Sequence, residues 1–312
     1  MLISTKLLLE KAMEQKFAVG AYNVNNMEII QGIVAAAKEL NAPLILQVSK
    51  GAREYAGIKY IKKLVEAAEE DSGLPIALHL DHGPTVELCK QCVDDGFTSI
   101  MFDGSHEPFA ENVRMTKEVV DYAHKHDVPV EAELGQLIGE QFDSGEGGKT
   151  GDGIYTDPDQ AKEFVQKTGC DSLAIAIGSS HGAYKFKGEP KLDFERLAKI
   201  REKLSIPLVL HAASSVLPEY VDVCNQFGGK IEGSKGVPEE QVQKAVEIGV
   251  QKVYIDTDLR LAFTGAVRKA LAENPSEFDP RKYLGPGREA IKIAVMRKIK
   301  LLGTDGKASL FT

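Results

Sequence analysis

The sequence has 312 residues, of which 43% are hydrophobic and 27% are charged, an ordinary balance for a globular protein with a sizeable core. Asp and Glu outnumber Lys and Arg by 46 to 38, and the resulting net charge of −8 argues against a binder of nucleic-acid backbones, which needs a basic face. No apolar run approaches the roughly 18 residues of a membrane span, and four cysteines make no disulfide framework, so we expect a cytoplasmic protein without membrane partners.

The predicted elements alternate between helical and strand patterns from the first residues onward. Residues 1–16 form an amphipathic pattern without a small-residue cleavage site, which predicts a helix and no signal peptide. Eight short apolar runs then predict strands at residues 17–22, 43–48, 75–80, 98–102, 129–134, 172–177, 206–210 and 252–255. Helical patterns lie between them at residues 27–40, 85–95, 110–125, 158–168 and 239–248, and Asp157 before Pro158 is a typical helix start.

Eight strand–helix units predict one α/β domain over residues 1–312, a closed (β/α)8 TIM barrel, with a doubly wound open sheet as the alternative. A Gly-rich segment at about residues 135–157 is expected to be a mobile lid, and residues from about 259 to 312 a C-terminal helical extension. Active sites of such barrels lie where the strands end. Polar groups follow all eight predicted strands: Asn23, Ser49, Asp81–His82, Asp103, Glu133, Ser180–His181, His211 and Asp256.

Three histidines, His82, His181 and His211, follow the third, sixth and seventh predicted strands. Three imidazoles from separate strands, with a fourth position left for substrate, are typical of a catalytic zinc site. The alternative is that each histidine caps a strand by hydrogen bonding. Asp81, next to a candidate ligand, either moves a proton to or from a substrate hydroxyl or orients an imidazole.

The remaining titratable residues near the strands divide into rim and interior positions. Glu131 and Glu133 share a strand face, and we expect Glu133 at the rim to lie near the metal and Glu131 to be structural. His79 is expected inside the barrel. Three further histidines are expected to be solvated: His106, His124 and His126.

Two segments favour phosphate binding. Residues 178–185 (GSSHGAYK) and 213–215 (ASS) carry glycines and small hydroxyl residues after the sixth and seventh strands, where backbone N–H groups can approach an anion. Arg260 can reach a second anion, with a surface ion pair as the alternative. Residues 143–150 (DSGEGGKT) resemble a P-loop but lack its first glycine, and Cys89 and Cys92 lie in a helical pattern that favours packing over metal binding.

Several motifs together carry a family resemblance: residues 20–27 (GAYNVNNM), 79–83 (HLDHG), 130–135 (VEAELG), 176–185 (AIGSSHGAYK), 256–260 (DTDLR) and 278–287 (FDPRKYLGPG). Across essentially its full length the chain resembles class II, zinc-dependent fructose-bisphosphate aldolases of the shorter bacterial and protist type. The resemblance implies reversible cleavage of a ketose 1,6-bisphosphate into dihydroxyacetone phosphate and glyceraldehyde 3-phosphate. It also implies one Zn2+ per chain, a homodimer or homotetramer, and a response to a monovalent cation.

The resemblance assigns roles to individual residues. His82, His181 and His211 match the zinc ligands, Glu133 matches a carboxylate that can hold the metal in an alternative position, and Asp81 matches the acceptor of the C4 hydroxyl proton. The positions that match substrate and phosphate contacts are Asn23, Gly182, Lys185, Ser214, Asp256 and Thr257, with Ser49 and Arg260 at the distal phosphate.

Three positions depart from the family pattern. Ala212 stands where a glycine is usual, Tyr254 where an asparagine touches the substrate, and Gln141 where a lid glutamate moves the carbon-bound proton; Glu140 beside it is the candidate for that role. These departures leave a tagatose 1,6-bisphosphate or other ketose-phosphate aldolase as an alternative, and also a catalytically weakened sugar-phosphate-binding relative. A metal-dependent barrel hydrolase is a further alternative, although the early His-x-His pair usual in such enzymes is missing.

Overall fold

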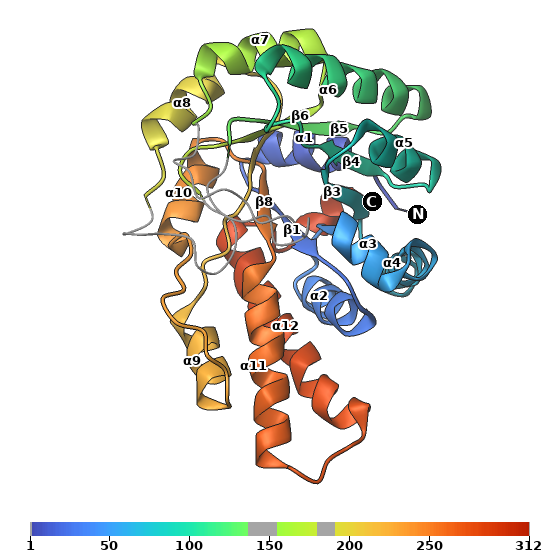
Figure 1. Ribbon diagram of the computed structural model, residues 1–312, viewed down its shortest axis with the longest axis vertical. Helices are drawn as coiled ribbons and strands as arrows, with labels where there is room; N and C mark the ends of the chain where they lie inside the picture. Colours follow the sequence, from blue (N-terminus) through green and yellow to red (C-terminus); the bar gives the residue numbers. More distant parts are fainter. Residues whose placement is uncertain (1, 137–154, 180–190, 312) are drawn as a thin grey trace.

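The computed structural model describes residues 2–136, 155–179 and 191–311, and eight parallel strands close into a barrel in sequence order (Figure 1). The strands are β1 (Val19–Asn23), β2 (Leu44–Ser49), β3 (Ile76–Gly83), β4 (Ser99–Phe102), β5 (Val130–Leu134), β6 (Ser172–Ile175), β7 (Leu208–Leu210) and β8 (Lys252–Ile255). Pairing of β1 with β8 closes the ring, so the barrel prediction is confirmed and the open sheet is excluded. The strand boundaries differ most at β3, which runs to Gly83 and not to residue 80.

Helices cover the outside of the barrel and one of its ends. They are α1 (Thr5–Gln15), α2 (Met27–Glu39), α3 (Lys50–Ala56), α4 (Ile58–Ser72), α5 (Val86–Asp94), α6 (Phe109–Ala123), α7 (Pro158–Thr168), α8 (Phe194–Lys203), α9 (Pro218–Gln226), α10 (Glu239–Ile248), α11 (Thr257–Glu273) and α12 (Pro280–Leu302), with short 3-10 turns at His124–His126 and Lys307–Leu310. The expected start of α7 is confirmed: the Asp157 carboxylate accepts hydrogen bonds from the backbone N–H groups of Asp159 and Gln160. None of the described helices is both long and apolar enough to cross a membrane.

The two faces of each strand have different surroundings, which is what positions the site. In β8, Val253 and Ile255 belong to the core between strands and helices, whereas Lys252 contacts residues of the barrel interior. At the amino ends of the strands, Leu8 and Leu9 of α1 pack against interior residues and close the barrel from below. The carboxyl ends form the opposite rim, where the polar residues of the strands gather.

The C-terminal segment forms a helical layer outside the barrel. Helix α11 packs against α12 and α9, and α12 also packs along α2, so these helices extend to one side of the barrel (Figure 1). A Cβ at Gly32 of α2 would lie 2.7 Å from the carbonyl oxygen of Arg288, so the close approach of α2 to α12 requires glycine. Most of the expected lid, residues 137–154, lies outside the described residues.

Candidate active site

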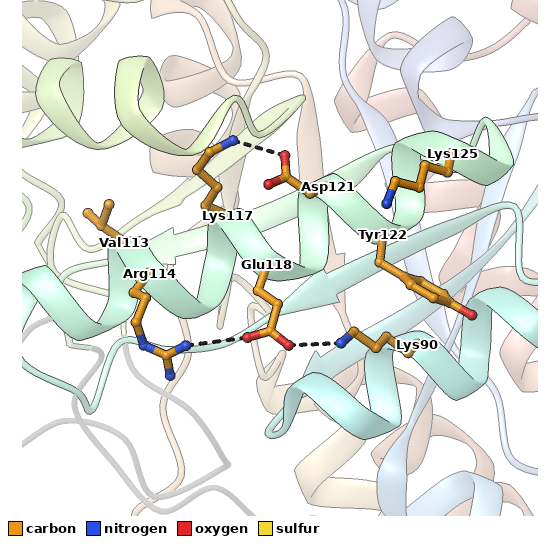
Figure 2. A pocket seen from close by; sticks show the side chains of 8 residues that line it. All are labelled: Lys90, Val113, Arg114, Lys117, Glu118, Asp121, Tyr122 and Lys125. Carbon is orange, nitrogen blue, oxygen red and sulfur yellow. Dashed lines mark hydrogen bonds and ion pairs between the residues drawn. The ribbon is translucent and has the colours of Figure 1, made fainter.

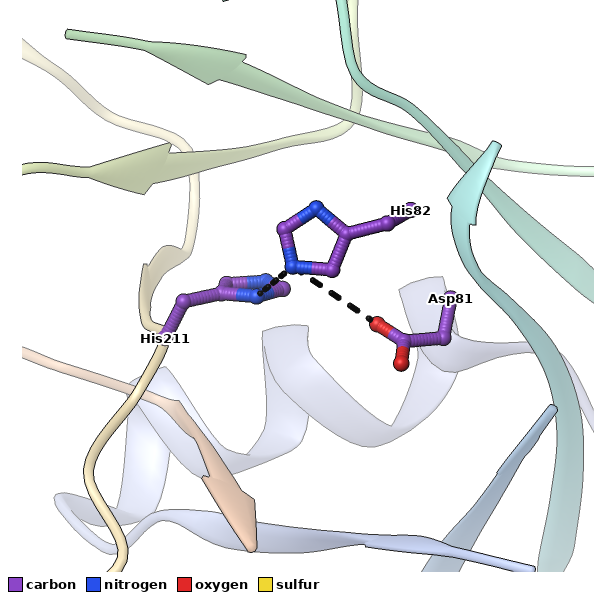
Figure 3. A group of neighbouring side chains, drawn as sticks. All are labelled: Asp81, His82 and His211. Carbon is purple, nitrogen blue, oxygen red and sulfur yellow. Dashed lines mark hydrogen bonds and ion pairs between the residues drawn. The ribbon is translucent and has the colours of Figure 1, made fainter. Parts of the chain in front are cut away.

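Two of the three histidines expected at a metal site lie within the described residues, and they face each other at the carboxyl ends of β3 and β7 (Figure 3). His82 Nε2 lies 2.9 Å from His211 Nδ1, and Asp81 Oδ1 lies 4.0 Å from the same His82 nitrogen. Asp81, His82 and His211 each offer a ligand atom within 4.8 Å of the others. Other predicted site residues lie outside the described residues: Glu140, His181, Gly182 and Lys185.

An irregularity at the end of β3 lets two neighbours in the sequence reach the same site. Successive side chains of a regular strand point to opposite faces. Here the pairing of β3 with β4 shifts between Leu80 and Gly83, and His82 has a φ of 43°, in the left-handed region. The local turn brings the His82 imidazole to the rim beside the carboxylate of Asp81.

Carboxylates surround His82. Its Nδ1 lies 2.8 Å from Asp103 Oδ2, and Asp103 Oδ1 accepts hydrogen bonds from the backbone N–H and hydroxyl of Ser105. Burial lowers the pKa of His82, but Asp81, Asp103 and Glu133 outweigh burial and raise the pKa to about 10. The cluster therefore stabilises positive charge at the imidazole, which is the electrostatic requirement of a cation site.

Two buried carboxylate oxygens also fit a cation. Asp81 Oδ1 and Glu133 Oε2 are buried and have no hydrogen-bond partner among the residues that the structure describes. Glu133 Oε2 lies 3.8 Å from His82 Nδ1, and burial, followed by the charge of Asp103, raises the pKa of Glu133 well above its usual value. The two oxygens lie on different sides of the His82 ring: Asp81 and His211 group with its Nε2, and Asp103 and Glu133 with its Nδ1. Imidazole nitrogens with buried carboxylates beside them are donors that suit a divalent metal.

A chain of buried polar groups continues from His211 into the barrel interior. His211 Nε2 lies 2.8 Å from Glu131 Oε1, and Lys252 Nζ donates to Glu131 Oε2 at 2.7 Å and lies 2.9 Å from His79 Nε2. Glu131, expected to be structural, thus orients a candidate metal ligand. The sequence analysis did not predict this role for Lys252, although a lysine within a strand that is buried on both faces was a signal that it has a buried partner. His79 is fully buried in the barrel, as expected.

Asn23, expected to contact the substrate, also forms hydrogen bonds to two neighbouring side chains. Its amide Nδ2 donates to Asp81 Oδ2 at 2.9 Å, and its Oδ1 accepts from Gln47 Nε2 at 2.5 Å. All three side chains are buried. Two neighbouring strands therefore fix the orientation of the Asp81 carboxylate. Sequence reasoning missed Gln47, although a glutamine within an otherwise apolar strand was the available signal.

The expected distal phosphate residues come together. Asn23, Ser49 and Arg260 line one cavity of about 360 Å3, together with Tyr55 of α3. Ser49 Oγ accepts from the backbone N–H of Ala52 as the helix cap, and Arg260 Nε donates to Asp256 Oδ1 at 2.8 Å. A guanidinium and a hydroxyl at a shared cavity suit a phosphate.

At the other expected phosphate site, after β7, the structure corrects one detail. Of the expected segment, residues 213–215, the backbone N–H of Ser215 donates to the buried Asp258 carboxylate and is therefore not available to an anion. The backbone N–H of Val216, the next residue, donates to the same carboxylate. The Ser214 Oγ accepts a hydrogen bond from the backbone N–H of Asp256 at 3.1 Å, and this bond does not use the Ser214 O–H as a donor. Thr257 begins α11 next to it.

Two of the departures from the family pattern lie directly at the histidines. Ala212 follows His211 with a φ of 56°, a conformation that favours glycine. The ring of Tyr254 packs on His211 with centroids 5.2 Å apart and lies 6.2 Å from the ring of His82. Gln141, the third departure, lies outside the described residues.

A wider groove lies away from these residues, on the outer helices. It has a volume of about 510 Å3 between α5 and α6, where Lys90 pairs with Glu118 and Lys117 with Asp121 (Figure 2). Four cationic side chains and two carboxylates line it, and Lys90, Arg114 and Lys117 form ion pairs of the kind common on helix surfaces. The three histidines expected to be solvated, His106, His124 and His126, are exposed.

A family model for class-II fructose-bisphosphate aldolase matches residues 3–307. The chain belongs to this family. A fructose-bisphosphate aldolase of Giardia intestinalis is 49% identical over 98% of this chain and 94% of its own, and one of Thermus caldophilus is 47% identical over 99% and 100%. The crystal structure of the YdjI aldolase from Escherichia coli K12 is 32% identical, with a TM-score of 0.78 over 99% of this chain and 100% of that one. The aldolase family is metal-dependent, in agreement with the imidazole and carboxylate groups at the rim.

Proposed function

We propose that this aldolase reversibly cleaves fructose 1,6-bisphosphate into dihydroxyacetone phosphate and glyceraldehyde 3-phosphate, with one zinc ion per chain. His82, His181 and His211 would hold the ion, with Glu133 in an alternative position. The observation that carries the proposal is the 2.9 Å approach of His82 Nε2 to His211 Nδ1, with the buried Asp81 Oδ1 4.0 Å from the same His82 nitrogen. A bound zinc ion supplies Lewis acidity at the substrate's carbonyl group.

Asp81 is the proton acceptor in the proposed cleavage. It takes the proton of the substrate's C4 hydroxyl, so that the C3–C4 bond can break, and returns the proton in the condensation direction. Asn23 holds Asp81 Oδ2, while Oδ1 accepts no hydrogen bond from the described residues, which supports a proton acceptor in a fixed orientation. Glu140 is the proposed residue for the carbon-bound proton.

Two phosphate sites orient the substrate across the barrel mouth in this proposal. One uses Ser49 and Arg260, with Asn23 between the cavity and Asp81; the other uses Gly182, Lys185, Ser214, Asp256 and Thr257. Binding energy from two phosphates at the ends of the sugar positions the reacting carbons between them. We further propose a single-domain cytoplasmic enzyme that forms a homodimer or homotetramer and responds to a monovalent cation.

Metal analysis combined with a coupled triose-phosphate assay tests the proposal. We expect one zinc per chain, loss of cleavage after treatment with a chelator, and recovery when zinc is restored. Full activity in protein shown by elemental analysis to contain no metal would refute the metal site.

Tyr254 and Ala212 at the histidines favour a second candidate, cleavage of tagatose 1,6-bisphosphate or another ketose phosphate. The two sugars differ at one carbon, so a comparison of kcat/KM for both decides between them. A protein that binds zinc and sugar phosphates without turnover would instead be a weakened relative.

A further inference from the structure

The segment between β7 and α9 has a backbone that needs external support. Ala212 and Val216 have φ values of 56° and 50°, in the left-handed region. This conformation is unfavourable for a residue with a Cβ, and most of all for a β-branched residue such as Val216. Such a backbone persists only where surrounding groups hold it. The same segment carries Ser214, the proposed phosphate contact.

The support comes mainly from Asp258 in the first turn of α11. Its two carboxylate oxygens accept separate hydrogen bonds, from the backbone N–H of Ser215 at 2.9 Å and from that of Val216 at 2.7 Å. Asp258 is fully buried. The backbone N–H of Val237 adds a hydrogen bond to the carbonyl oxygen of Ser214, at 3.1 Å.

Lys298 of α12 supplies the positive charge that this buried carboxylate needs. Its ammonium group lies 3.0 Å from Asp258 Oδ2, 2.8 Å from Ser215 Oγ and 2.9 Å from Glu239 Oε1. Three acceptors match the three N–H donors of a lysine ammonium, and the side chain is only 4% exposed. One buried cation thus joins the segment after β7 to α10, α11 and α12.

We propose that Lys298 is a positioning residue for phosphate binding. Through Asp258 and Ser215 it holds residues 212–216 in the backbone conformation that presents the Ser214 hydroxyl to the substrate's phosphate. The inference rests on the proposed function in taking Ser214 as a phosphate contact. It gives the C-terminal helix α12 a role in substrate binding, although the polar partners of Lys298 within the described residues are Asp258, Ser215 and Glu239 and not a proposed substrate contact.

Replacement of the cation tests this role, and the neighbouring residue provides a matched control. Lys298→Met removes the charge and keeps an unbranched side chain. Arg297→Met removes an equal charge from the same helix and the same partner, Glu239, but from a side chain that is 45% exposed. Lys298→Arg keeps the charge and is the rescue variant. Binding of dihydroxyacetone phosphate to the metal-loaded full-length chain is measured by calorimetry, and bound metal by elemental analysis.

We expect Lys298→Met to raise the Kd of dihydroxyacetone phosphate by about tenfold or more, the size expected for losing hydrogen bonds to a charged group. The KM of the bisphosphate should rise in parallel while kcat and bound metal change little. Arg297→Met should leave all of these values unchanged, and Lys298→Arg should restore most of the affinity. Unchanged phosphate binding in Lys298→Met, or an equal loss in Arg297→Met, would overturn the inference.

A buried carboxylate left without its cation can prevent folding. If Lys298→Met does not fold, the double variant Asp258→Asn, Lys298→Met is measured in its place, because it carries no unpaired buried charge. Wild-type affinity of this double variant for dihydroxyacetone phosphate overturns the inference. Weakened affinity with full metal content supports it. Failure of the proposed function has a separate signature, because the wild-type chain would then not cleave the bisphosphate at all.

Discussion

The carboxylate of Glu131 lies 2.8 Å from Nε2 of His211, and this contact determines which nitrogen of the imidazole is available at the rim. Hydrogen bonding to a carboxylate keeps the proton on Nε2, so the lone pair of Nδ1 faces His82. Lys252 in turn offsets the buried charge of Glu131. Residues of the barrel interior thus orient His211 and select the nitrogen that it offers to a metal.

Glu131→Gln is therefore expected to weaken metal binding by about 10- to 100-fold, the usual effect of removing a group that orients a ligand. Competition with a chelator of known affinity measures the change. Glu118→Gln is the matched control, since Glu118 is a surface partner of Lys90 on the outer helices. Equal metal affinity in the Glu131 variant and the wild type would mean that the contact with Glu131 does not orient His211 for metal binding.

Asp81→Asn is expected to lower kcat by about 10²- to 10⁴-fold, the usual contribution of general acid–base catalysis, while zinc is retained. The asparagine preserves an acceptor for Asn23 Nδ2 but cannot take a proton. The triose-phosphate assay and metal analysis of the same preparation measure the two properties, with Asp121→Asn on α6 as a surface control. Parallel loss of metal would identify Asp81 as a ligand, a role that its distance from His82 also permits.

Ala212→Gly is expected to stabilise the protein by about 0.5 to 1 kcal/mol, because relief of the left-handed Ala212 backbone exceeds the added entropy of the unfolded chain. Urea unfolding measures the change. Ala213→Gly is the control: Ala213 does not have a positive φ, so the same substitution should destabilise. Destabilisation by both substitutions would show that the Ala212 methyl group contributes more by packing than its backbone costs.

Tyr254→Asn is expected to raise kcat/KM for fructose 1,6-bisphosphate severalfold. The phenol ring packs on His211, and an asparagine there offers a paired donor and acceptor that a phenol cannot reproduce. Tyr254→Phe separates the effect of the hydroxyl from that of the ring. An unchanged kcat/KM in Tyr254→Asn would show that position 254 does not contact the substrate.

The barrel, and the polar residues at the carboxyl ends of its strands, were predictable from local patterns in the sequence. Eight near-continuous apolar runs indicate parallel strands covered on both faces, and parallel strands bring all their carboxyl ends to one rim. His82, His211, Asp81 and Glu133 could therefore be grouped before any distance was known. The tertiary structure groups His82 with Asp81 and His211 on one side and with Asp103 and Glu133 on the other.

The sequence by itself thus determined the fold and the candidate ligands, whereas the tertiary structure alone decided how each group is held. The orientation of Asp81 by Asn23, the choice of nitrogen in His211 and the support of Ser215 by Lys298 join residues 58, 80 and 83 positions apart. No local periodicity encodes such pairs. The left-handed backbone of Ala212 was likewise not predictable from the sequence, because it depends on the contacts that hold residues 212–216. Asp258 of α11 supplies one of these contacts, at Ser215.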